Sequence, residues 1–182
     1  TIDGGSWKAF QPRSEGSDAI VCAAWDVPVL LCFADCVPVI LVAPDGSFAV
    51  VHAGWRGALA DIPAIAARAL SRAIAPDGAL GCCNAYIGPH IGACCFETGS
   101  DVASAFRARF GDAVIVGGDH VDLSYAVRLS LLSAGFTAER IVDAHVCTCC
   151  EHERFFSYRA EGGTTGRIGA LACRRRQGHG IG

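Results

Sequence analysis

A thiol and an imidazole are spaced in this sequence so that they could act together. Cys36 directly precedes the apolar stretch Val37–Val42, and His52 ends the apolar stretch Phe48–His52. The Pro-Asp-Gly sequence at 44–46 predicts a turn, because Pro presets φ and Gly supplies a positive φ. The ends of such a hairpin lie together, so Cys36 and His52 could bind zinc or copper, or form a nucleophile with its base. The alternative is a buried cysteine and a core histidine.

The sequence Gly54-Trp55-Arg56-Gly57 follows His52 almost directly. Backbone N–H groups at a helix start can receive an anion, and the Arg56 guanidinium suits phosphate or carboxylate. The Trp55 ring could stack on a flat base. The alternative is a packing tryptophan and a surface ion pair, which the neighbouring His52 makes less convincing.

Two further stretches contain groups that could bind a ligand. His90 lies in a loop with two Gly and one Pro and is a possible metal ligand, although a loop histidine is more often merely exposed. The stretches 155–159 and 164–167 bring Arg159 and Arg167 around a glycine-containing loop. They predict either a pocket for an anionic substrate or ordinary strands with solvated arginines.

Short strands and helices must position these groups. Apolar, β-branched stretches predict strands, and capped stretches with helical spacing predict helices. The expected strands are 20–22, 27–33, 37–42, 48–52, 79–87, 113–116 and 141–146, with two more within 155–173, and the expected helices are 61–75, 100–110 and 123–134. The continuous apolarity of the early strands predicts burial on both faces. Their irregular order favours one α+β domain over 1–182, with mixed β-sheets and flanking helices.

The composition excludes several classes of protein. With 182 residues, of which 52% are hydrophobic and 18% charged, the chain can bury a substantial core and is not disordered. A net charge of −3 without a basic stripe argues against a nucleic-acid partner. No apolar run reaches the roughly 18 residues of a membrane span.

Cysteine is abundant, with eleven residues. An odd number in a chain this long does not suggest a secreted disulfide framework. The adjacent pairs 82–83, 94–95 and 149–150 have a spacing that zinc clusters do not favour, and 147–150 is a lone C-x-x-C. We therefore expect most of these cysteines to be small buried residues in a reducing cytoplasm.

Several motifs together resemble one known family. They are "ADCVPVIL", "VHAGWRGALADI", "IGPHIGACCFETGSDV", "HVDL" and "CTCCEHERFFSYRAEGGTTGR", in order from about Ser17 to about Ala172. They are similar to the successive signatures of the laccase-domain family, also called the multicopper polyphenol oxidase, peptidoglycan-editing-factor or purine nucleoside phosphorylase family. The resemblance covers nearly the whole chain.

The resemblance implies a metal-dependent purine nucleoside enzyme. The implied reactions are phosphorolysis of adenosine, inosine, guanosine and methylthioadenosine, and deamination of adenosine. The implied metal is zinc, with copper as the other candidate, and its ligands are one Cys and two His. Two ligands correspond to Cys36 and His52, and the third is a His in a Gln-Val-His-Gly motif. That motif is expected upstream of Thr1, in an N-terminal segment that we expect to be missing.

We expect the candidate residues to have distinct roles in these reactions. Cys36, His52 and Arg56 are expected to be catalytic, and Arg56, Arg159 or Arg167 could receive phosphate. Trp55, Arg159 and Arg167 are expected to bind the purine nucleoside and phosphate, and either Trp55 or the Phe155–Phe156 pair could stack the base.

Three alternatives remain. One is a hydrolase or amidase that depends on Cys36 and His52 and is linked to peptidoglycan quality control. The second is a copper polyphenol oxidase, but six scattered histidines cannot build the several copper sites of a classical laccase. The third is a non-enzymatic binding protein. The oligomeric state and the preferred nucleoside are left open by the sequence.

Overall fold

The computed structural model describes residues 17–74 and 80–176, which form two sheets and four α-helices. The larger sheet has the strand order β1-β4-β3-β5-β6, with β5 and β6 parallel and the other neighbours antiparallel. Its strands are β1 (Ala19–Cys22), β3 (Val37–Val42), β4 (Phe48–Ala53), β5 (Asn84–Ile87) and β6 (Ile141–Asp143). The smaller sheet pairs β2 (Pro28–Phe33) with β7 (Ile168–Cys173). The prediction of an α+β fold with mixed sheets is confirmed.

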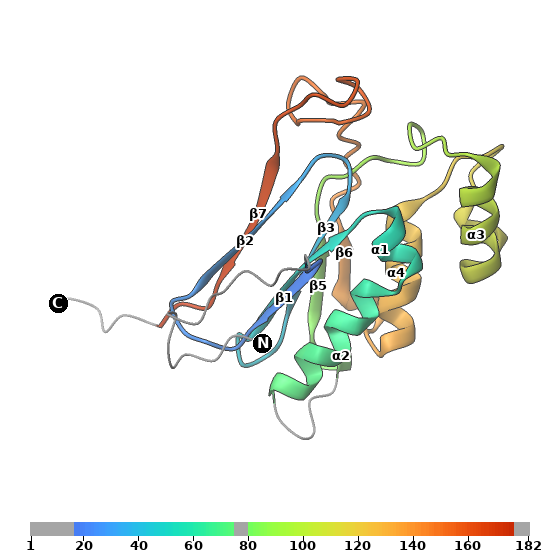
Figure 1. Cartoon of the computed structure of the whole chain (residues 1–182). Coiled ribbons are helices and arrows are strands. Elements are labelled where there is room, and N and C mark those ends of the chain that lie inside the picture. The colour runs from blue at the N-terminus through green and yellow to red at the C-terminus, as the bar shows by residue number, and fades with distance from the viewer. Residues whose placement is uncertain (1–16, 75–79, 177–182) are drawn as a thin grey trace.

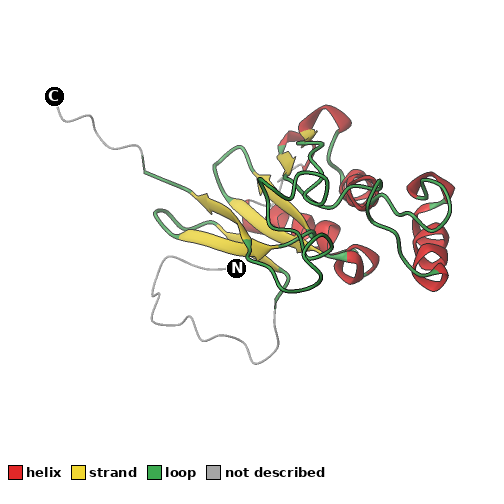
Figure 2. Cartoon of the chain, turned by 90° about the horizontal axis from the view of Figure 1, so that it is seen from above, coloured by secondary structure: helices red, strands yellow, loops and turns green. Residues whose placement is uncertain are grey.

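The helices and the smaller sheet lie on opposite sides of the larger sheet (Figures 1 and 2). The helices are α1 (Trp55–Leu59), α2 (Ile62–Ile74), α3 (Ser100–Phe110) and α4 (Leu123–Ala134). Short 3-10 turns lie at Leu80–Cys82, Asp112–Val114 and Ala138–Arg140. Among the described residues, no helix has the length and apolar character that crossing a membrane requires.

Side chains of β4 alternate between two cores, which explains why this strand is apolar throughout. Ala49, Val51 and Ala53 join the core under the helices, whereas Phe48 and Val50 join the core under β2 and β7. Successive side chains of a strand point to opposite faces, so His52 shares the face of Phe48 and Val50. The predicted burial on both faces is confirmed for β3 and β4, and in β4 it turns His52 toward the smaller sheet. It is wrong for β2, where alternate side chains are exposed.

The β3–β4 hairpin has the predicted turn. Gly46 has φ +85°, a conformation that glycine adopts at no steric cost. The Asp45 carboxylate accepts hydrogen bonds from the backbone N–H and the hydroxyl of Ser47. This local bonding fixes the register in which Pro38 pairs with His52.

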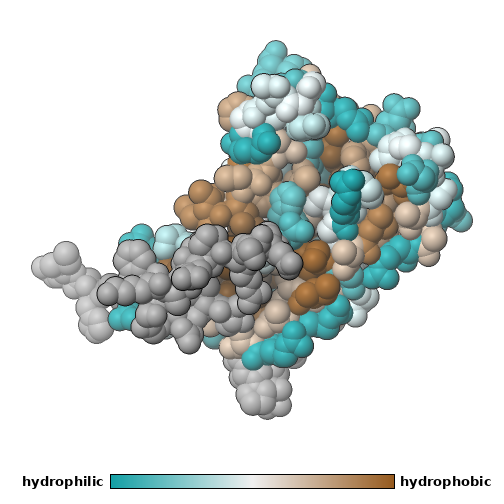
Figure 3. All heavy atoms as spheres, in the orientation of Figure 1, coloured by the Kyte–Doolittle hydropathy of each residue, from teal (hydrophilic) through white to brown (hydrophobic). Residues whose placement is uncertain are grey.

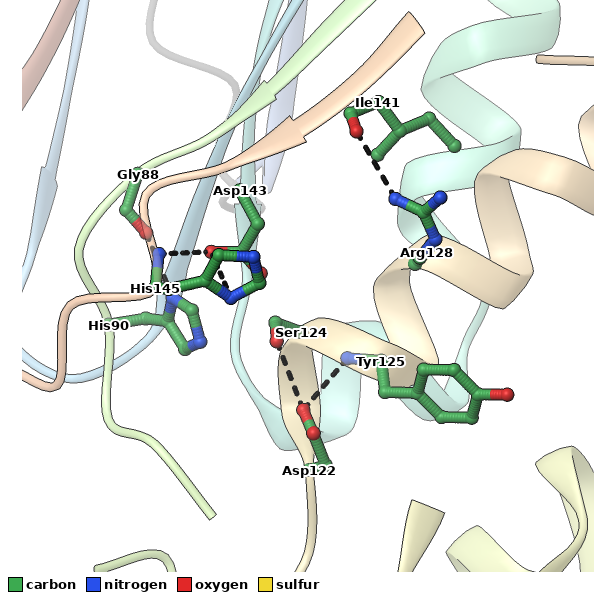
Figure 4. A network of polar contacts seen from close by, with 9 residues as sticks. All are labelled: Gly88, His90, Asp122, Ser124, Tyr125, Arg128, Ile141, Asp143 and His145. Carbon is green, nitrogen blue, oxygen red and sulfur yellow. Dashed lines mark hydrogen bonds and ion pairs between the residues drawn. The ribbon is translucent and has the colours of Figure 1, made fainter. Parts of the chain in front are cut away.

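Helix α4 begins and ends where the sequence predicts. The Asp122 carboxylate accepts from the Tyr125 N–H at 2.8 Å, which satisfies one of the unpaired amides of the first turn (Figure 4). Gly135 ends the helix in the left-handed conformation. Arg128 then donates to the Ile141 carbonyl and ties the helix to β6.

Some predicted strands are absent or shorter among the described residues. The stretch 113–116 contains part of a 3-10 turn, and 155–159 forms turns. In 155–159 the Ser157 N–H donates to the Glu161 carboxylate, a side-chain bond that competes with strand pairing. Strand β6 ends at Asp143, whose carboxylate accepts from the His145 N–H.

The outer face of the β2–β7 sheet carries exposed apolar side chains. Leu30 and Leu171 are cross-strand partners and are 57% and 62% exposed. Figure 3 shows apolar surface in this part of the molecule. Apolar residues therefore gather on this outer face as well as in the two cores on either side of β4.

Candidate active site

Cys36 and His52 meet at the open end of the β3–β4 hairpin. The antiparallel register that pairs Val37 with Ala53 places Cys36 opposite Gly54. A Cβ atom built on Gly54 would lie 3.0 Å from Cys36 Sγ and 3.7 Å from His52 Cε1. The thiol and the imidazole therefore border the space that this glycine leaves free. The hairpin brings the two residues together as the sequence predicts, and their chemical role stays a prediction.

Asp18 orients the His52 ring. Its Oδ1 lies 3.4 Å from His52 Nδ1, and the Phe33 ring packs against the imidazole with 5.2 Å between ring centroids. A carboxylate at Nδ1 favours the tautomer protonated there, which leaves Nε2 able to bind a metal or a proton. Sequence reasoning missed Asp18, because it belongs to no motif. Its position just before a strand that pairs with β4 was the available signal.

The environment of Cys36 keeps its thiol protonated. Burial, and then the Asp35 and Asp18 carboxylates, raise the pKa of Cys36 above its ordinary value of 9.0, and Arg167 opposes them. A metal would reverse this balance, because metals bind the thiolate and release its proton. One thiolate and one imidazole suit zinc or copper, and Gly54 leaves room beside both. The residues present therefore fit part of such a site.

Asp35 joins this site to loops far along the chain. It is buried and has φ +78°, a left-handed conformation that Asp tolerates better than most residues. Its carboxylate accepts from Thr148 Oγ1 and from the Arg159 backbone N–H, both at 2.7 Å. Its carbonyl accepts from the Ile91 N–H at 2.9 Å. The position of Cys36, the next residue, therefore depends on these loops.

Trp55 and Arg56 begin helix α1 beside the same glycine. Trp55 is half-buried, and the Arg56 guanidinium is exposed and stacks on the indole with 4.1 Å between Cζ and the ring centroid. One face of the indole is thus covered by its own neighbour. A base that stacks on Trp55 would use the other face or displace Arg56.

The two predicted substrate arginines differ in their bonding. The Arg159 guanidinium donates to the carbonyls of Cys95 at 2.8 Å and Glu97 at 2.9 Å, so it holds that loop. The exposed Arg167 guanidinium donates to carbonyls of its own loop, and its charge acts on the pKa of Cys36. Arg167 is therefore the better placed of the two for an anion near Cys36.

The expectation that His90 is an exposed loop residue is wrong. The side chain is buried, and its Nδ1 lies 2.8 Å from the Gly88 carbonyl oxygen (Figure 4). The backbone N–H of His90 donates to Val146 and its carbonyl accepts from Thr148. The Gly-Pro-His loop is therefore packed against the segment that follows β6.

The expectation that most cysteines are buried is also wrong. All eleven lie in described residues, and only Cys22 and Cys83 are buried. A group of four partly or fully exposed cysteines has its sulfur atoms within 4.8 Å of one another: Cys94, Cys95, Cys147 and Cys150. Sequence reasoning missed this group, because its two halves come from separate loops and contain only one C-x-x-C motif.

Hydrogen bonds distinguish the four thiols. Burial opposes ionisation of Cys147, but N–H donation from Cys150 and Gly92 outweighs it and lowers the pKa of Cys147 to about 7. Burial and the sulfur atoms of Cys150 and Cys147 raise the pKa of Cys94 to about 11. Burial and neighbouring thiols likewise raise the pKa of Cys95.

The sequence is similar to those of known proteins. Residues 4–175 match the family model described as multi-copper polyphenol oxidoreductase laccase. The chain is 40% identical over 162 residues to adenosine deaminase RL5 from an unknown prokaryotic organism, which covers 84% of the chain and 60% of that protein. It is 35% identical over 178 residues to purine nucleoside phosphorylase YlmD of Geobacillus stearothermophilus, which covers 92% of the chain and 64% of the relative.

Solved structures have the same fold. Bacillus licheniformis hypothetical protein YfiH superposes with a TM-score of 0.80 at 29% identity, covering 87% of this chain and 61% of that one. YlmD of Geobacillus stearothermophilus gives a TM-score of 0.79 at 34% identity, covering 88% and 62%. The chain thus spans less than two thirds of the length of these relatives.

Proposed function

The chain belongs to the multi-copper polyphenol oxidoreductase laccase family, and on this premise we propose that it acts on purine nucleosides at a metal centre that includes Cys36 and His52. The proposed reactions are phosphorolysis of adenosine, inosine, guanosine and methylthioadenosine, and deamination of adenosine. The names of two relatives, an adenosine deaminase and a purine nucleoside phosphorylase, support both kinds of reaction.

The convergence of Cys36 Sγ and the His52 ring on the space beside Gly54 carries this proposal. Zinc is the proposed metal and copper the other candidate, because both accept thiolate and imidazole. When bound, the metal would supply a Lewis acid that lowers the pKa of water. The third ligand, a His upstream of Thr1, stays a prediction.

The other residues would serve binding and orientation. Asp18 holds the His52 ring, and Asp35 fixes the backbone beside Cys36. Arg56 and Arg167 supply positive charge for phosphate, and Trp55 offers a flat apolar face for the base. In phosphorolysis a phosphate oxygen bonds to ribose C1′ while the bond to purine N9 breaks, and the base leaves with a proton. In deamination water adds at C6 and ammonia leaves.

Product analysis with and without phosphate tests the proposal. The natural protein, carrying whatever sequence precedes Thr1, is loaded with zinc and given adenosine. Adenine and ribose 1-phosphate are expected only with phosphate, whereas inosine and ammonia are expected in both conditions. Zinc-loaded protein that forms none of these products would contradict the proposal.

Arg56→Ala separates the two reactions. We expect the KM for phosphate to rise about tenfold or more, since a charge-assisted bond is worth about 1.5–3 kcal/mol, with deamination little changed. Arg72→Ala, at an exposed position in α2, is the matched control. Unaltered phosphorolysis in Arg56→Ala would remove this residue from the phosphate site.

A Cys-dependent hydrolase or amidase linked to peptidoglycan quality control is the second candidate. The order Asp18, His52, Cys36 favours it, because an acid–base–nucleophile arrangement has the same sequence of contacts. The raised pKa of Cys36 opposes it, because a catalytic cysteine needs accessible thiolate. Stoichiometric zinc that protects Cys36 from alkylation would favour the nucleoside enzyme, whereas a covalent Cys36 acyl adduct would favour the hydrolase.

A further inference from the structure

We propose that Cys94, Cys95, Cys147 and Cys150 form a second metal site, a structural tetrathiolate zinc site that joins two loops beside the Cys36–His52 pair. This site is separate from the proposed active site and does not depend on the proposed function. Four cysteines complete the ligand set of a closed structural zinc site, so no further protein group is needed.

The distances between the sulfur atoms fit a single tetrahedral ion. Zinc–sulfur bonds of about 2.3 Å place the ligand sulfurs of a tetrahedron about 3.8 Å apart. Cys150 Sγ lies 3.4 Å from Cys95 Sγ and 3.6 Å from Cys94 Sγ, and all four sulfurs lie within 4.8 Å of one another. One small ion can therefore contact all four with little movement of the side chains.

The same distances argue against a disulfide bond between any two of the four cysteines. A disulfide joins two sulfurs and leaves the others out. Cys150 Sγ is almost equally far from the sulfurs of Cys94 and Cys95, so neither pair is singled out. An iron–sulfur cluster would distribute its cysteines over several irons and would need a wider arrangement.

Two backbone amides donate to one of the four sulfurs, as amides do around bound thiolates. The Gly92 N–H donates to Cys147 Sγ at 3.2 Å and the Cys150 N–H donates to the same sulfur at 3.4 Å. Four thiolates around a divalent ion leave a net negative charge, which such donors and nearby cations offset. The Arg159 guanidinium, bonded to the Cys95 carbonyl, supplies positive charge next to the cysteines.

Gly92 lies where the two halves of the cysteine group approach each other. A Cβ atom at this position would lie 3.3 Å from both Cys94 Sγ and Cys147 Cβ. These separations are tighter than most real Cβ contacts, so a side chain would push the two halves of the group apart. The glycine lets the 92–95 turn approach Cys147 closely.

The proposed ion would fix the surroundings of Cys36. Thr148 lies inside the C-x-x-C segment, is fully buried and donates to the Asp35 carboxylate. Arg159 donates to Asp35 through its backbone and to the Cys95 and Glu97 carbonyls through its side chain. One loop held by the ion therefore contacts Asp35 directly through Thr148, and the other is joined to Asp35 through Arg159.

Metal analysis of the full chain tests the site. The chain is purified under reducing conditions in the Cys36→Ala background, which removes a ligand of the proposed active site. Zinc at about one ion per chain is expected, and it should be lost in Cys150→Ser. Cys173→Ser, at an exposed cysteine of β7, should keep its zinc.

Cobalt provides a readout that does not depend on the fold of Cys150→Ser. Cobalt chloride added to the zinc-free Cys36→Ala chain should give intense thiolate-to-cobalt charge-transfer bands and the visible bands of tetrahedral cobalt. Zinc chloride should abolish them. Absent charge-transfer bands, preferential retention of iron, or a Cys150 disulfide in anaerobically purified protein would overturn the proposal.

Discussion

Two neighbouring regions place cysteines for chemistry in different ways. Cys36 belongs to a strand end and shares its surroundings with one imidazole, whereas Cys94, Cys95, Cys147 and Cys150 come from two loops and face one another. Burial raises the pKa of Cys36, whereas amide donation lowers the pKa of Cys147 to about 7. In our proposals, a metal at the first region would keep open coordination positions, as a catalytic metal requires, and a metal at the second would be held by four thiolates, as a structural metal is.

One of the contacts between the regions is a buried hydrogen bond. Thr148 lies between the loop cysteines and donates to Asp35 at 2.7 Å. The loop that carries Thr148 can therefore hold the strand end at Cys36 in place without contributing a ligand. We therefore expect substitutions in the first region to remove activity. Substitutions at the Thr148–Asp35 hydrogen bond should change stability more than activity.

The largest effect is expected from Cys36→Ala. The natural zinc-loaded protein should lose roughly a hundredfold or more of its nucleoside turnover, because even outer partners of metal ligands are worth about 10–100-fold. Steady-state assays with adenosine and phosphate measure it. Cys173→Ser should stay near full activity. Comparable turnover in both variants would remove Cys36 from the active site.

Thiol reactivity should differ about tenfold between the regions. In metal-free, reduced chain, iodoacetamide modifies thiolates, whose fraction rises with pH through the pKa. Cys147 should reach half its maximal rate near pH 7 and Cys36 only above pH 9. Near pH 7 the thiolate fractions differ by roughly two orders of magnitude, partly offset by the weaker nucleophilicity of the more acidic thiol. Peptide mapping by mass spectrometry measures both, and equal rates would favour the hydrolase.

Gly54→Ala should weaken the first region several-fold. The added methyl would enter the space beside Cys36 Sγ, and overpacking of this kind costs about 1–3 kcal/mol. We expect lower zinc affinity in a competition titration and unchanged cobalt bands from the loop cysteines. Gly81→Ala is the control, because its Cβ would make only ordinary contacts at 3.7 Å. Full zinc affinity in Gly54→Ala would show that the metal lies elsewhere.

Thr148→Val should have the smallest effect, chiefly on stability. Loss of the hydroxyl leaves Asp35 with one hydrogen bond fewer in a buried place, at a cost of about 1–3 kcal/mol. The melting temperature should fall by about 2–4 °C per kcal/mol in a chain of this size. Calorimetry measures it, with the exposed Thr164→Val as control. An unchanged melting temperature would mean that the link between the regions contributes little.

The sequence predicts features that depend on neighbours in the chain. The β3–β4 hairpin follows from its own turn residues, and α4 follows from Asp122 and Gly135, so both are found where expected. The meeting of Cys36 and His52 follows from the hairpin alone. The hydrogen bonds of the hairpin turn and of the α4 ends form between residues close in the sequence, so distant partners do not shift them.

Features that depend on distant partners could not be predicted. The four loop cysteines converge because two loops pack together, and adjacent cysteines in one loop gave no sign of it. His90 is buried because the segment after β6 covers it. The Arg159 guanidinium donates to two backbone carbonyls of another loop, which also depends on a distant partner, and its expected role at the substrate stays a prediction.

Anomalous diffraction at the zinc edge tests the central claim most directly. Crystals of the natural protein with bound zinc would show where the ions lie relative to the two regions. We expect one peak between Cys36 and His52 and a second among Cys94, Cys95, Cys147 and Cys150. Fully zinc-loaded crystals without a peak between Cys36 and His52 would contradict this expectation.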